Sequence, residues 1–419
     1  MSFQQGLSGL NATSRHLEVI GNNIANAGTY GAKVARAEFA DVYANSIGTT
    51  NNIGIGVQVA DVVQQFTQGS VVSTSNTLDV AINGAGFFQF RDTSGTLSYS
   101  RNGQFKVDSA GHVVNSQGHR LLGYRADDQG RIIPQSSAEL QLPTAGIAPR
   151  ATDRVGLELN LDSRAAVTRP ASGDTLAFDD PSTYNSATSA TVYDVKGQPI
   201  GVTFYFQKAG ADRWNVYASA SGTPLARDAA GNPAPVTTMT FPGSGAAPTS
   251  PTGAVAVPLP ALTQADGAST EPVPGLTVDF TSATQYGTGF NVTDLTQNGH
   301  ASGQLSNLSI EANGLITARY SNGLTRSAGQ VELANFRNPQ GLRSVGGNGW
   351  VSTYQSGEPV GGVPGTGTLG ALQAGALEES NVDMTAELVN MITAQRLYQA
   401  NAQTIKTQDS VMQTLVNLR

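Results

Sequence analysis

Apolar residues recur at a seven-residue interval near the start of the sequence, with few charges between them. Residues seven apart in an α-helix lie on the same face, so this spacing predicts an amphipathic helix within residues 1–32 with a narrow apolar stripe. Gly21, Asn22 and Asn23 weaken the helix, and the stretch from Asn26 to Gly31 should end it. The stripe consists of Phe3, Leu7, Leu10, Leu17 and Ile24.

The other end of the chain repeats this pattern over a longer stretch. No Gly or Pro occurs from Leu377 to Arg419, which predicts a long helix over residues 377–419. Acidic residues gather near its start, where the helix dipole favours negative charge. Its apolar stripe consists of Met384, Leu388, Met391, Tyr398, Ile405 and Met412.

Between the two ends, apolar and polar residues alternate with the period of β-strands. Residues 78–82 read as a strand that enters a tight turn at Asn83-Gly84, and residues 87–90 read as the returning strand. Three further strands are predicted at residues 191–195, 202–206 and 214–217. Residues 233–274 hold nine of the chain's 19 prolines, which excludes a regular helix there and confines strands to sheet edges.

Two helices with apolar stripes need a surface to cover them. They can pair with each other as a hairpin on the side of a soluble domain, or they can pack against neighbouring copies of the chain. A short, Gly-bearing helix draws most of its stability from packing, and a heptad pattern over several repeats specifies a partner helix. The pattern therefore favours assembly, with the hairpin as the alternative.

Composition narrows the class of protein further. Only 13% of residues are charged, against roughly 25% in an average soluble domain, so the polar surface is mostly uncharged and suits close packing of identical copies. The net charge of -7 and the lack of a basic cluster argue against nucleic-acid binding. The sequence has no cysteine, no apolar run of membrane-spanning length and no conventional signal peptide at its start.

Candidate chemistry is sparse, and we expect no catalytic, cofactor-binding or metal site. Residues 365–370 match G-x-G-x-x-G, but Pro364 precedes them instead of a strand, so we interpret them as a loop. His112 and His119 could be close across a hairpin, but no acidic partner lies at ligand spacing between them. A pair of carboxylates that meets only in three dimensions stays open.

Several longer motifs resemble the flagellar rod and hook protein family. At the N-terminus they are residues 6–10 and 21–26, and at the C-terminus residues 380–384, 387–389 and 395–401. Residues 78–90, 99–105 and 335–342 are similar to the same family. Within it the hook proteins match best, because rod proteins are shorter and lack a large β insertion after about residue 145.

This resemblance implies a multidomain, mainly β fold with terminal helices that pair as a coiled coil in the assembly. Residues 1–32 and 377–419 would form the inner helical domain, and residues 33–70 and 360–376 extended connecting segments. Residues 71–145 and 285–359 would form a discontinuous β domain, with residues 146–284 inserted as an outer β domain.

The implied function is that of a structural, non-enzymatic subunit that polymerises into the curved, flexible flagellar hook and transmits torque. Implied partners are other copies of the chain, the distal rod protein, the hook-filament junction protein, the hook cap and the type III export apparatus. The location would be extracellular, without a cleaved signal peptide. Alternatives are a distal-rod-type paralogue with an enlarged outer domain and a secreted β-rich carbohydrate-binding protein.

Two further expectations concern how such a subunit would assemble and bend. The two apolar stripes would be the assembly interface, with Asn22, Asn23 and Asn26 adding subunit contacts. Glycines near Gly69, Gly146 and Gly287 would act as hinges that let domains tilt.

Overall fold

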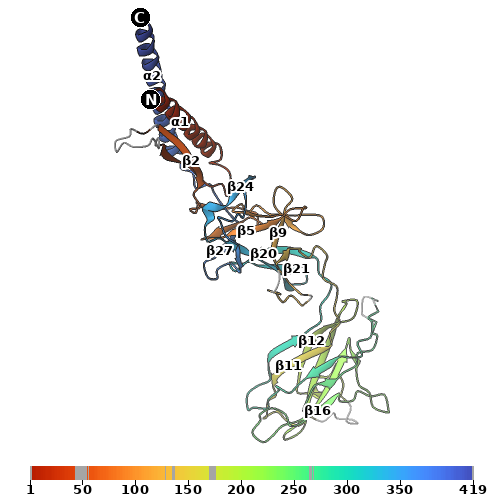
Figure 1. Cartoon of the computed structure of the whole chain (residues 1–419). Coiled ribbons are helices and arrows are strands. Elements are labelled where there is room, and N and C mark those ends of the chain that lie inside the picture. The colour runs from red at the N-terminus through yellow and green to blue at the C-terminus, as the bar shows by residue number, and fades with distance from the viewer. Residues whose placement is uncertain are drawn as a thin grey trace. The chain divides into compact units, whose positions relative to one another are not determined.

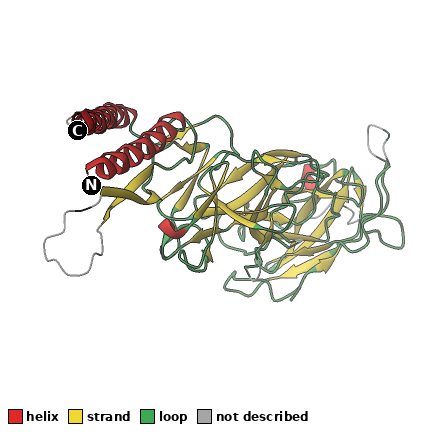
Figure 2. Ribbon diagram, turned by 45° about the horizontal axis from the view of Figure 1, so that its top comes forward, coloured by secondary structure: helices red, strands yellow, loops and turns green. Residues whose placement is uncertain are grey.

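The computed structural model describes residues 2–42, 54, 56–127, 129–134, 137–168, 176–263, 267 and 269–417. The chain forms two compact units, shown in Figures 1 and 2. The first unit contains residues up to 144 together with 306–319 and 325–419, and the second contains 145–305 and 320–324. No helix among the described residues is long and apolar enough to cross a membrane.

Both chain ends are helical. Helix α1 spans Ser2–Ala25, as the apolar periodicity predicts. Helix α2 spans Met384–Asn417, so the predicted start at residue 377 is wrong. Leu377 pairs instead with Val72, because residues 376–378 form strand β28 beside strand β3. Helix α2 then begins after Asp383, whose carboxylate accepts the backbone N–H groups of Thr385 and Ala386 as an N-cap.

A β-hairpin follows α1 and packs along it (Figure 1). Its strands are β1 (Ala35–Val42) and β2 (Gly56–Gln64), which pair antiparallel with a bulge between Glu38 and Phe39. These residues belong to the predicted connecting segment 33–70, of which 43–53 and 55 lie outside the described residues. The segment is thus a structured ribbon where the structure describes it.

The rest of the first unit is β structure. The central strand order in its largest sheet is β20-β21-β22-β9-β5-β6-β25-β24, and two small pairs, β27 with β4 and β28 with β3, adjoin the chain ends. The strands are β3 (Val71–Ser73), β4 (Val80–Asn83), β5 (Phe87–Arg91), β6 (Leu97–Ser100), β7 (Lys106–Val107), β8 (Val113–Val114), β9 (Arg120–Arg125), β10 (Ala138–Glu139), β20 (Leu305–Ile310), β21 (Leu315–Tyr320), β22 (Thr325–Val331), β23 (Leu333–Asn335), β24 (Arg343–Gly346), β25 (Gly349–Val351), β26 (Val360–Gly362), β27 (Ala371–Ala374) and β28 (Ala376–Glu378). The short 3₁₀ helix η2 (Pro339–Gly341) lies before β24.

One predicted hairpin in this unit is wrong. The strands at residues 80–83 and 87–91 exist, but β4 pairs with β27 whereas β5 pairs with β6, β9 and β23. The Asn83-Gly84 turn therefore moves the chain from one sheet to another. Because both strands are almost fully buried, their periodicity carries no information about which neighbour they choose.

The second unit packs two sheets over one core. One sheet has the order β17-β18-β11-β19, and the other has β12-β13-β14-β15 with β16 beside β14. The predicted strands at 202–206 and 214–217 lie in β13 and β14, and the one at 191–195 covers the end of β12, which stops at Tyr193; the three strands are consecutive and antiparallel. The elements are β11 (Arg154–Asn160), η1 (Pro181–Thr183), β12 (Ser186–Tyr193), β13 (Pro199–Gly210), β14 (Arg213–Ala220), β15 (Thr223–Pro224), β16 (Thr237–Thr240), β17 (Val255–Ala256), β18 (Thr277–Asp279) and β19 (Asn291–Gln297).

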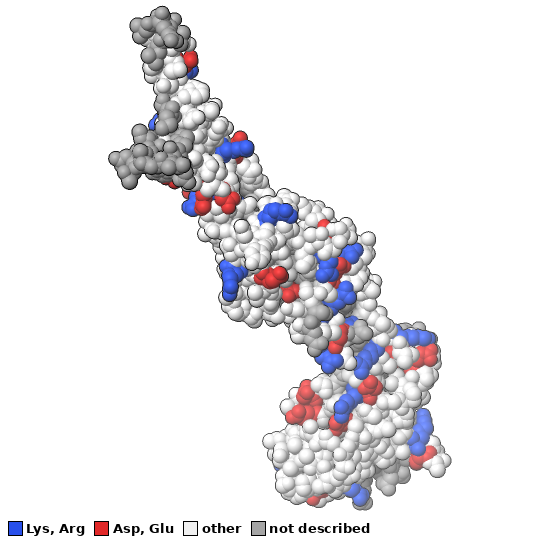
Figure 3. All heavy atoms as spheres, in the orientation of Figure 1, with Lys and Arg blue, Asp and Glu red and all other residues white. Residues whose placement is uncertain are grey.

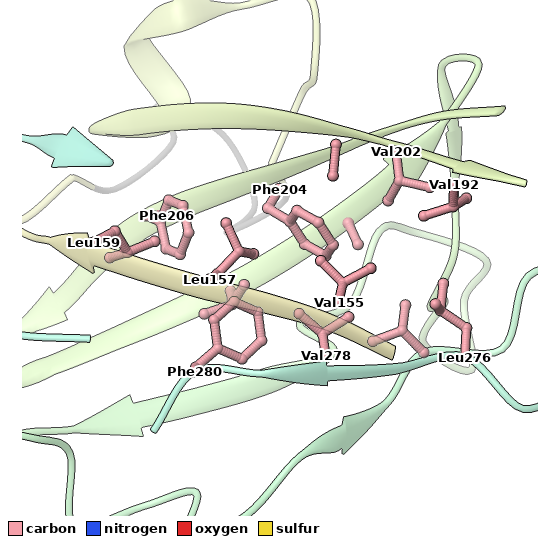
Figure 4. Packing of buried hydrophobic residues seen from close by; sticks show 14 of the residues in the cluster. Val155, Leu157, Leu159, Val192, Val202, Phe204, Phe206, Leu276, Val278 and Phe280 are labelled. Carbon is pink, nitrogen blue, oxygen red and sulfur yellow. The ribbon is translucent and has the colours of Figure 1, made fainter. Parts of the chain in front are cut away.

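The core of the second unit is large and rich in aromatic residues. Figure 4 shows Phe204 and Phe206 of β13 in the same core as Leu157 of β11 and Phe280 beyond β18. Trp214 is also fully buried, and its indole N–H donates to Gln285 Oε1 at 2.8 Å. The proline-rich stretch contributes only the short strands β16 and β17 among its described residues, as its composition predicts.

The inserted unit is longer than the sequence pattern suggested. Residues 285–305, expected in the discontinuous β domain, belong to the second unit. They carry strand β19, which pairs with β11 at the start of the insertion. The entering and leaving segments also pair, through bridges of Ile147 with Gly303 and Arg150 with His300. The boundary was misplaced because pairing between residues so far apart in sequence leaves no local signal.

Candidate assembly interface

The two terminal helices meet through the smallest residues of α1. A Cβ atom on Gly6 would lie 3.0 Å from Ile405 Cγ1, and one on Gly9 would lie 2.9 Å from the side-chain amide of Asn401. On α2, Ala394 is buried. Glycines at these positions let the helix backbones approach closely, so α1 meets α2 through small residues that lie on or beside the face of its apolar stripe.

The β1–β2 hairpin covers a further side of α1. Ser8 Oγ accepts the backbone N–H of Val57 at 3.3 Å, and Gln5 Nε2 donates to the Gly54 carbonyl at 2.7 Å. The rings of His16 and Phe39 meet edge to face with centroids 5.6 Å apart. Helix α1 is thus held between α2 and the hairpin within one chain.

This arrangement leaves part of the predicted stripes uncovered. Leu10, Leu17 and Ile24 on α1, and Met391 and Ile405 on α2, are half-buried. The other six stripe residues are 41–55% exposed: Phe3, Leu7, Met384, Leu388, Tyr398 and Met412. The hairpin and assembly alternatives therefore do not exclude each other, because the helices pair in the chain and still present apolar side chains to solvent.

Four more apolar residues of α2 are exposed outside the heptad positions. They are Val389, Ile392, Leu397 and Val411, with exposed fractions from 47 to 58%. Ile392 lies one turn after Leu388 and so extends the stripe sideways. The sequence feature that could have identified them is that the apolar residues of this segment are not confined to one helix face, which is typical of a helix with more than one neighbour. Figure 3 shows that charged residues are sparse and of mixed sign on the visible described surface.

Asn23 has a role inside the chain. Its Nδ2 donates to the Ala35 carbonyl at 2.8 Å and its Oδ1 accepts the Ala35 N–H at 2.9 Å, so it fastens the start of β1 to α1. Asn26 Nδ2 donates to the carbonyl of Asn22 at 3.0 Å at the helix end. Asn23 is buried, which removes it from the predicted subunit contacts.

The glycine-rich motif and His112, which the sequence suggested as weak candidates for a binding site, lie in loops and turns. Residues 365–370 form a loop between β26 and β27, with no helix after them. His112 lies within 3.3 Å of the Asp108 carboxylate in a tight turn. No group of three or more metal-ligating side chains gathers among the described residues.

Comparison with known proteins assigns these regions to one family. Residues 3–33 match "Flagella basal body rod protein", and residues 81–149 match "Flagellar hook protein FlgE/F/G D1 domain". Residues 160–300 match "Flagellar basal body protein FlaE D2 domain", and residues 373–418 match "Flagellar basal body rod FlgEFG protein C-terminal". The flagellar hook protein FlgE of Escherichia coli K12 is 41% identical over 426 residues that cover 100% of both chains. The chain belongs to the flagellar hook protein family.

Two more distant hook proteins also match the chain. FlgE of Rhizobium meliloti is 32% identical, with 100% of this chain and 98% of that protein covered. The crystal structure of Helicobacter pylori hook protein FlgE2 covers 74% of this chain and 99% of that chain, with a TM-score of 0.52 and 14% identity. That structure supports the hook protein fold.

Proposed function

We propose that the chain is the subunit that polymerises into the flagellar hook, a curved, flexible tube that couples the motor and rod to the filament and transmits torque. Membership of the hook protein family supports a structural role in the flagellum. A rod-type paralogue and a carbohydrate-binding protein are not favoured, because the hook proteins match over the whole chain.

One observation carries this proposal: the terminal helices already cover each other and still expose large apolar side chains. Phe3 and Leu7 on α1 and Leu388 and Ile392 on α2 are each about half exposed. Contiguous exposed apolar side chains of this kind mark protein–protein contacts. The occupant we propose is another copy of the same chain, since a heptad stripe suits a helix of matching pattern.

The eleven stripe residues would divide into two roles. The half-buried group around Ile405 would hold α1 against α2 in each subunit. The exposed group around Leu388 would meet α-helices of adjoining subunits and build a continuous inner layer. Such a layer resists twist because close-packed side chains are nearly incompressible.

Bending would use contacts that exchange at low cost. The second unit has a well-packed core of its own, and the chain as a whole has few charges. Exposed ion pairs contribute little to binding, so neighbouring copies could slide over one another as the tube rotates. The second unit's entering and leaving segments pair near Gly146, which would transmit force through two chain segments at once.

Position in the flagellum follows from this role. We propose contacts with the distal rod protein at one end of the tube, with the hook-filament junction protein at the other, and with a hook cap during growth. Export through the flagellar type III apparatus would deliver the subunit to the outside of the cell.

The decisive variant is Leu388→Asp in the full-length chain. A charge at an exposed stripe position would have to be buried between subunits, whereas the fold of the single chain would not change. We expect loss of polymer in electron micrographs and in sedimentation at a concentration at which the unmodified chain forms tubes. Circular dichroism of the unassembled variant should match that of the unmodified chain.

Val195→Asp is the matched control, because Val195 is 58% exposed in a turn of the second unit. It should polymerise normally. Normal tubes from Leu388→Asp would refute the helix interface, and equal loss from both variants would show that any added charge on the surface prevents assembly.

A further inference from the structure

Four separated backbone segments of the first unit converge between the helices and the β domain. They are residues 31–34 after α1, 65–70 after β2, 100–102 after β6 and 376–381 before α2. We call this meeting point the neck. The first segment connects α1 to the β1–β2 hairpin, the second connects the hairpin to the β domain, and the fourth connects the β domain to α2.

A buried carboxylate lies at the centre of the neck. Glu378 Oε1 is 2.6 Å from Lys33 Nζ, and both side chains are completely buried. Glu378 Oε2 is 3.2 Å from Arg101 Nη1, whose side chain is 4% exposed. The Arg101 guanidinium also lies 5.4 Å from the centre of the Phe87 ring. One carboxylate therefore serves two buried cations that come from distant parts of the sequence.

Backbone groups complete the cluster. Gly69 N–H donates to Glu378 Oε1 at 2.9 Å, and Lys33 Nζ donates to the Thr67 carbonyl at 2.7 Å. Gly31 N–H donates to the Glu378 carbonyl at 2.8 Å. A Cβ on Gly69 would clash with the Glu379 carbonyl. Gly69 is thus required for a close approach of two chain segments, and this close packing argues against a hinge at Gly69 itself.

The side-chain amide of Asn381, next to the cluster, forms further hydrogen bonds between the neck segments. Asn381 Oδ1 accepts the Val34 N–H at 2.8 Å, and its Nδ2 donates to the Gln65 carbonyl at 2.9 Å and to Thr67 Oγ1 at 2.7 Å. The segment before α2 thereby bonds to both chain segments that leave the α1 and hairpin region. These contacts join opposite ends of the sequence.

The electrostatics make Glu378 the critical member. Desolvation lowers the pKa of Lys33 and of Arg101, while the charge of Glu378 acts in the opposite direction and stabilises both cations. Without Glu378, two cations would be left buried without a counter-ion, which strongly destabilises the buried state. We therefore expect the segments that carry Lys33 and Arg101 to pack together only when the Glu378 carboxylate lies between the two cations.

We propose that Glu378 is a latch that couples the two chain ends: docking of the segment before α2 and burial of the segment after α1 occur as one event. When the latch is open, Lys33 and Arg101 return to solvent and both helices detach from the β domain together. This inference concerns the single chain and does not depend on polymerisation into a hook.

Trypsin tests the latch in the full-length, unassembled chain, because it must draw a Lys or Arg side chain into its own pocket. Peptide mass spectrometry would follow cleavage after Lys33 and Arg101, both buried, and after Arg164, which is exposed in a turn of the second unit and serves as reference. Cleavage of a protected bond tracks the population of the open form, so we expect Glu378→Gln to raise the rates after Lys33 and Arg101 at least tenfold relative to Arg164. Glu379→Gln, which removes an exposed carboxylate one residue away, should leave them unchanged.

Coupling requires a parallel change in α2. The Arg396 side chain is exposed, but its peptide bond lies inside α2, and a helix that loses its packing partners unfolds readily. Cleavage after Arg396 should therefore rise by about the same factor as cleavage after Lys33. A rise after Lys33 alone, or no rise at either bond, would overturn the latch. Lys208, buried in the second unit with Nζ bonded to the Ser163 and Ala165 carbonyls, reports whether that unit stays folded.

A second variant decides the matter if Glu378→Gln unfolds the whole first unit. Lys33→Met retains the Arg101–Glu378 pair and removes one buried cation. The latch predicts that the bond after Arg101 stays as protected as in the unmodified chain. Loss of that protection in Lys33→Met would refute Glu378 as the common anchor.

Discussion

The second unit and the helical ends of the first unit solve the same problem of burial in different ways. In the second unit, large apolar residues such as Phe204, Phe206 and Trp214 are fully enclosed by its own two sheets. In the helix pair, the residues of α1 that meet α2 include the small Gly6 and Gly9, while Leu388 and other large residues face solvent. One region completes its core alone and the other does not.

This difference teaches where assembly free energy is available. Burial of apolar surface contributes about 25 cal/mol per Å², and the second unit has already used most of its apolar side chains inside the chain. The helices retain exposed apolar side chains that can be buried when subunits assemble. A subunit built in this way can fold its second unit before assembly and gain further stability at its helices in the polymer.

The largest expected effect tests whether the second unit is stabilised by its own core. Phe204→Ala removes a fully buried ring from its core and should lower the free energy of unfolding of that unit by about 3–5 kcal/mol. Trp214 fluorescence during urea unfolding is the measurement, because that indole lies in the same core. Thr203→Ala, on the other face of the same strand, should change the free energy by less than about 1 kcal/mol. Similar effects from both would contradict a single packed core.

The helices are tested by two glycines that face different surroundings. Gly9→Leu would force a side chain into Asn401 and separate α1 from α2, so we expect a loss of about 2 kcal/mol or more in the stability of the helix pair, of the size seen on overpacking. Gly21→Ala has open space around its Cβ and should stabilise α1 by up to about 1 kcal/mol. Thermal unfolding followed by far-ultraviolet circular dichroism, which reports helix content, is the measurement. If Gly9→Leu melted no lower than Gly21→Ala, the small-residue contact would be wrong.

The smallest expected effect concerns acid stability, which both units share. In turns that begin at Asp92, Asp108, Asp127 and Asp228, the carboxylate accepts the backbone N–H groups two and four residues on. For Asp108, the N–H of His112 is the main cause that lowers the pKa. A carboxyl whose pKa is lowered by folding stabilises the fold above its unfolded pKa of about 3.9 and loses that contribution as pH falls through the folded value.

Asp108→Asn should therefore change little at neutral pH and reduce the fall in melting temperature between about pH 5 and pH 3. The chain contains its own precedent, because Asn115 makes the same two contacts in the next turn. Scanning calorimetry at several pH values is the measurement. An unchanged pH dependence in the variant would show that the turn carboxylate does not contribute to acid sensitivity.

Local structure was readable from the sequence because the interacting atoms lie close along the chain. The six turns at Asp92, Asp108, Asn115, Asp127, Asp194 and Asp228 share the pattern Asp/Asn-x-x-Gly-x, with the Gly at positive φ. Both helices follow from apolar spacing, and α1 ends where the Asn and Gly residues predict. The fold class and the family could be assigned for the same reason, since the terminal motifs are continuous segments.

Tertiary structure alone decided which faces and segments meet. Nothing near Gly6 or Gly9 in the sequence indicates that they lie against α2. Strand β4 pairs with β27 and not with β5, the next strand in sequence. Glu378 forms an ion pair with Lys33, which lies 345 residues away in the sequence. Such contacts depend on distant groups brought together by loop closure and burial, whose free energy no local pattern contains.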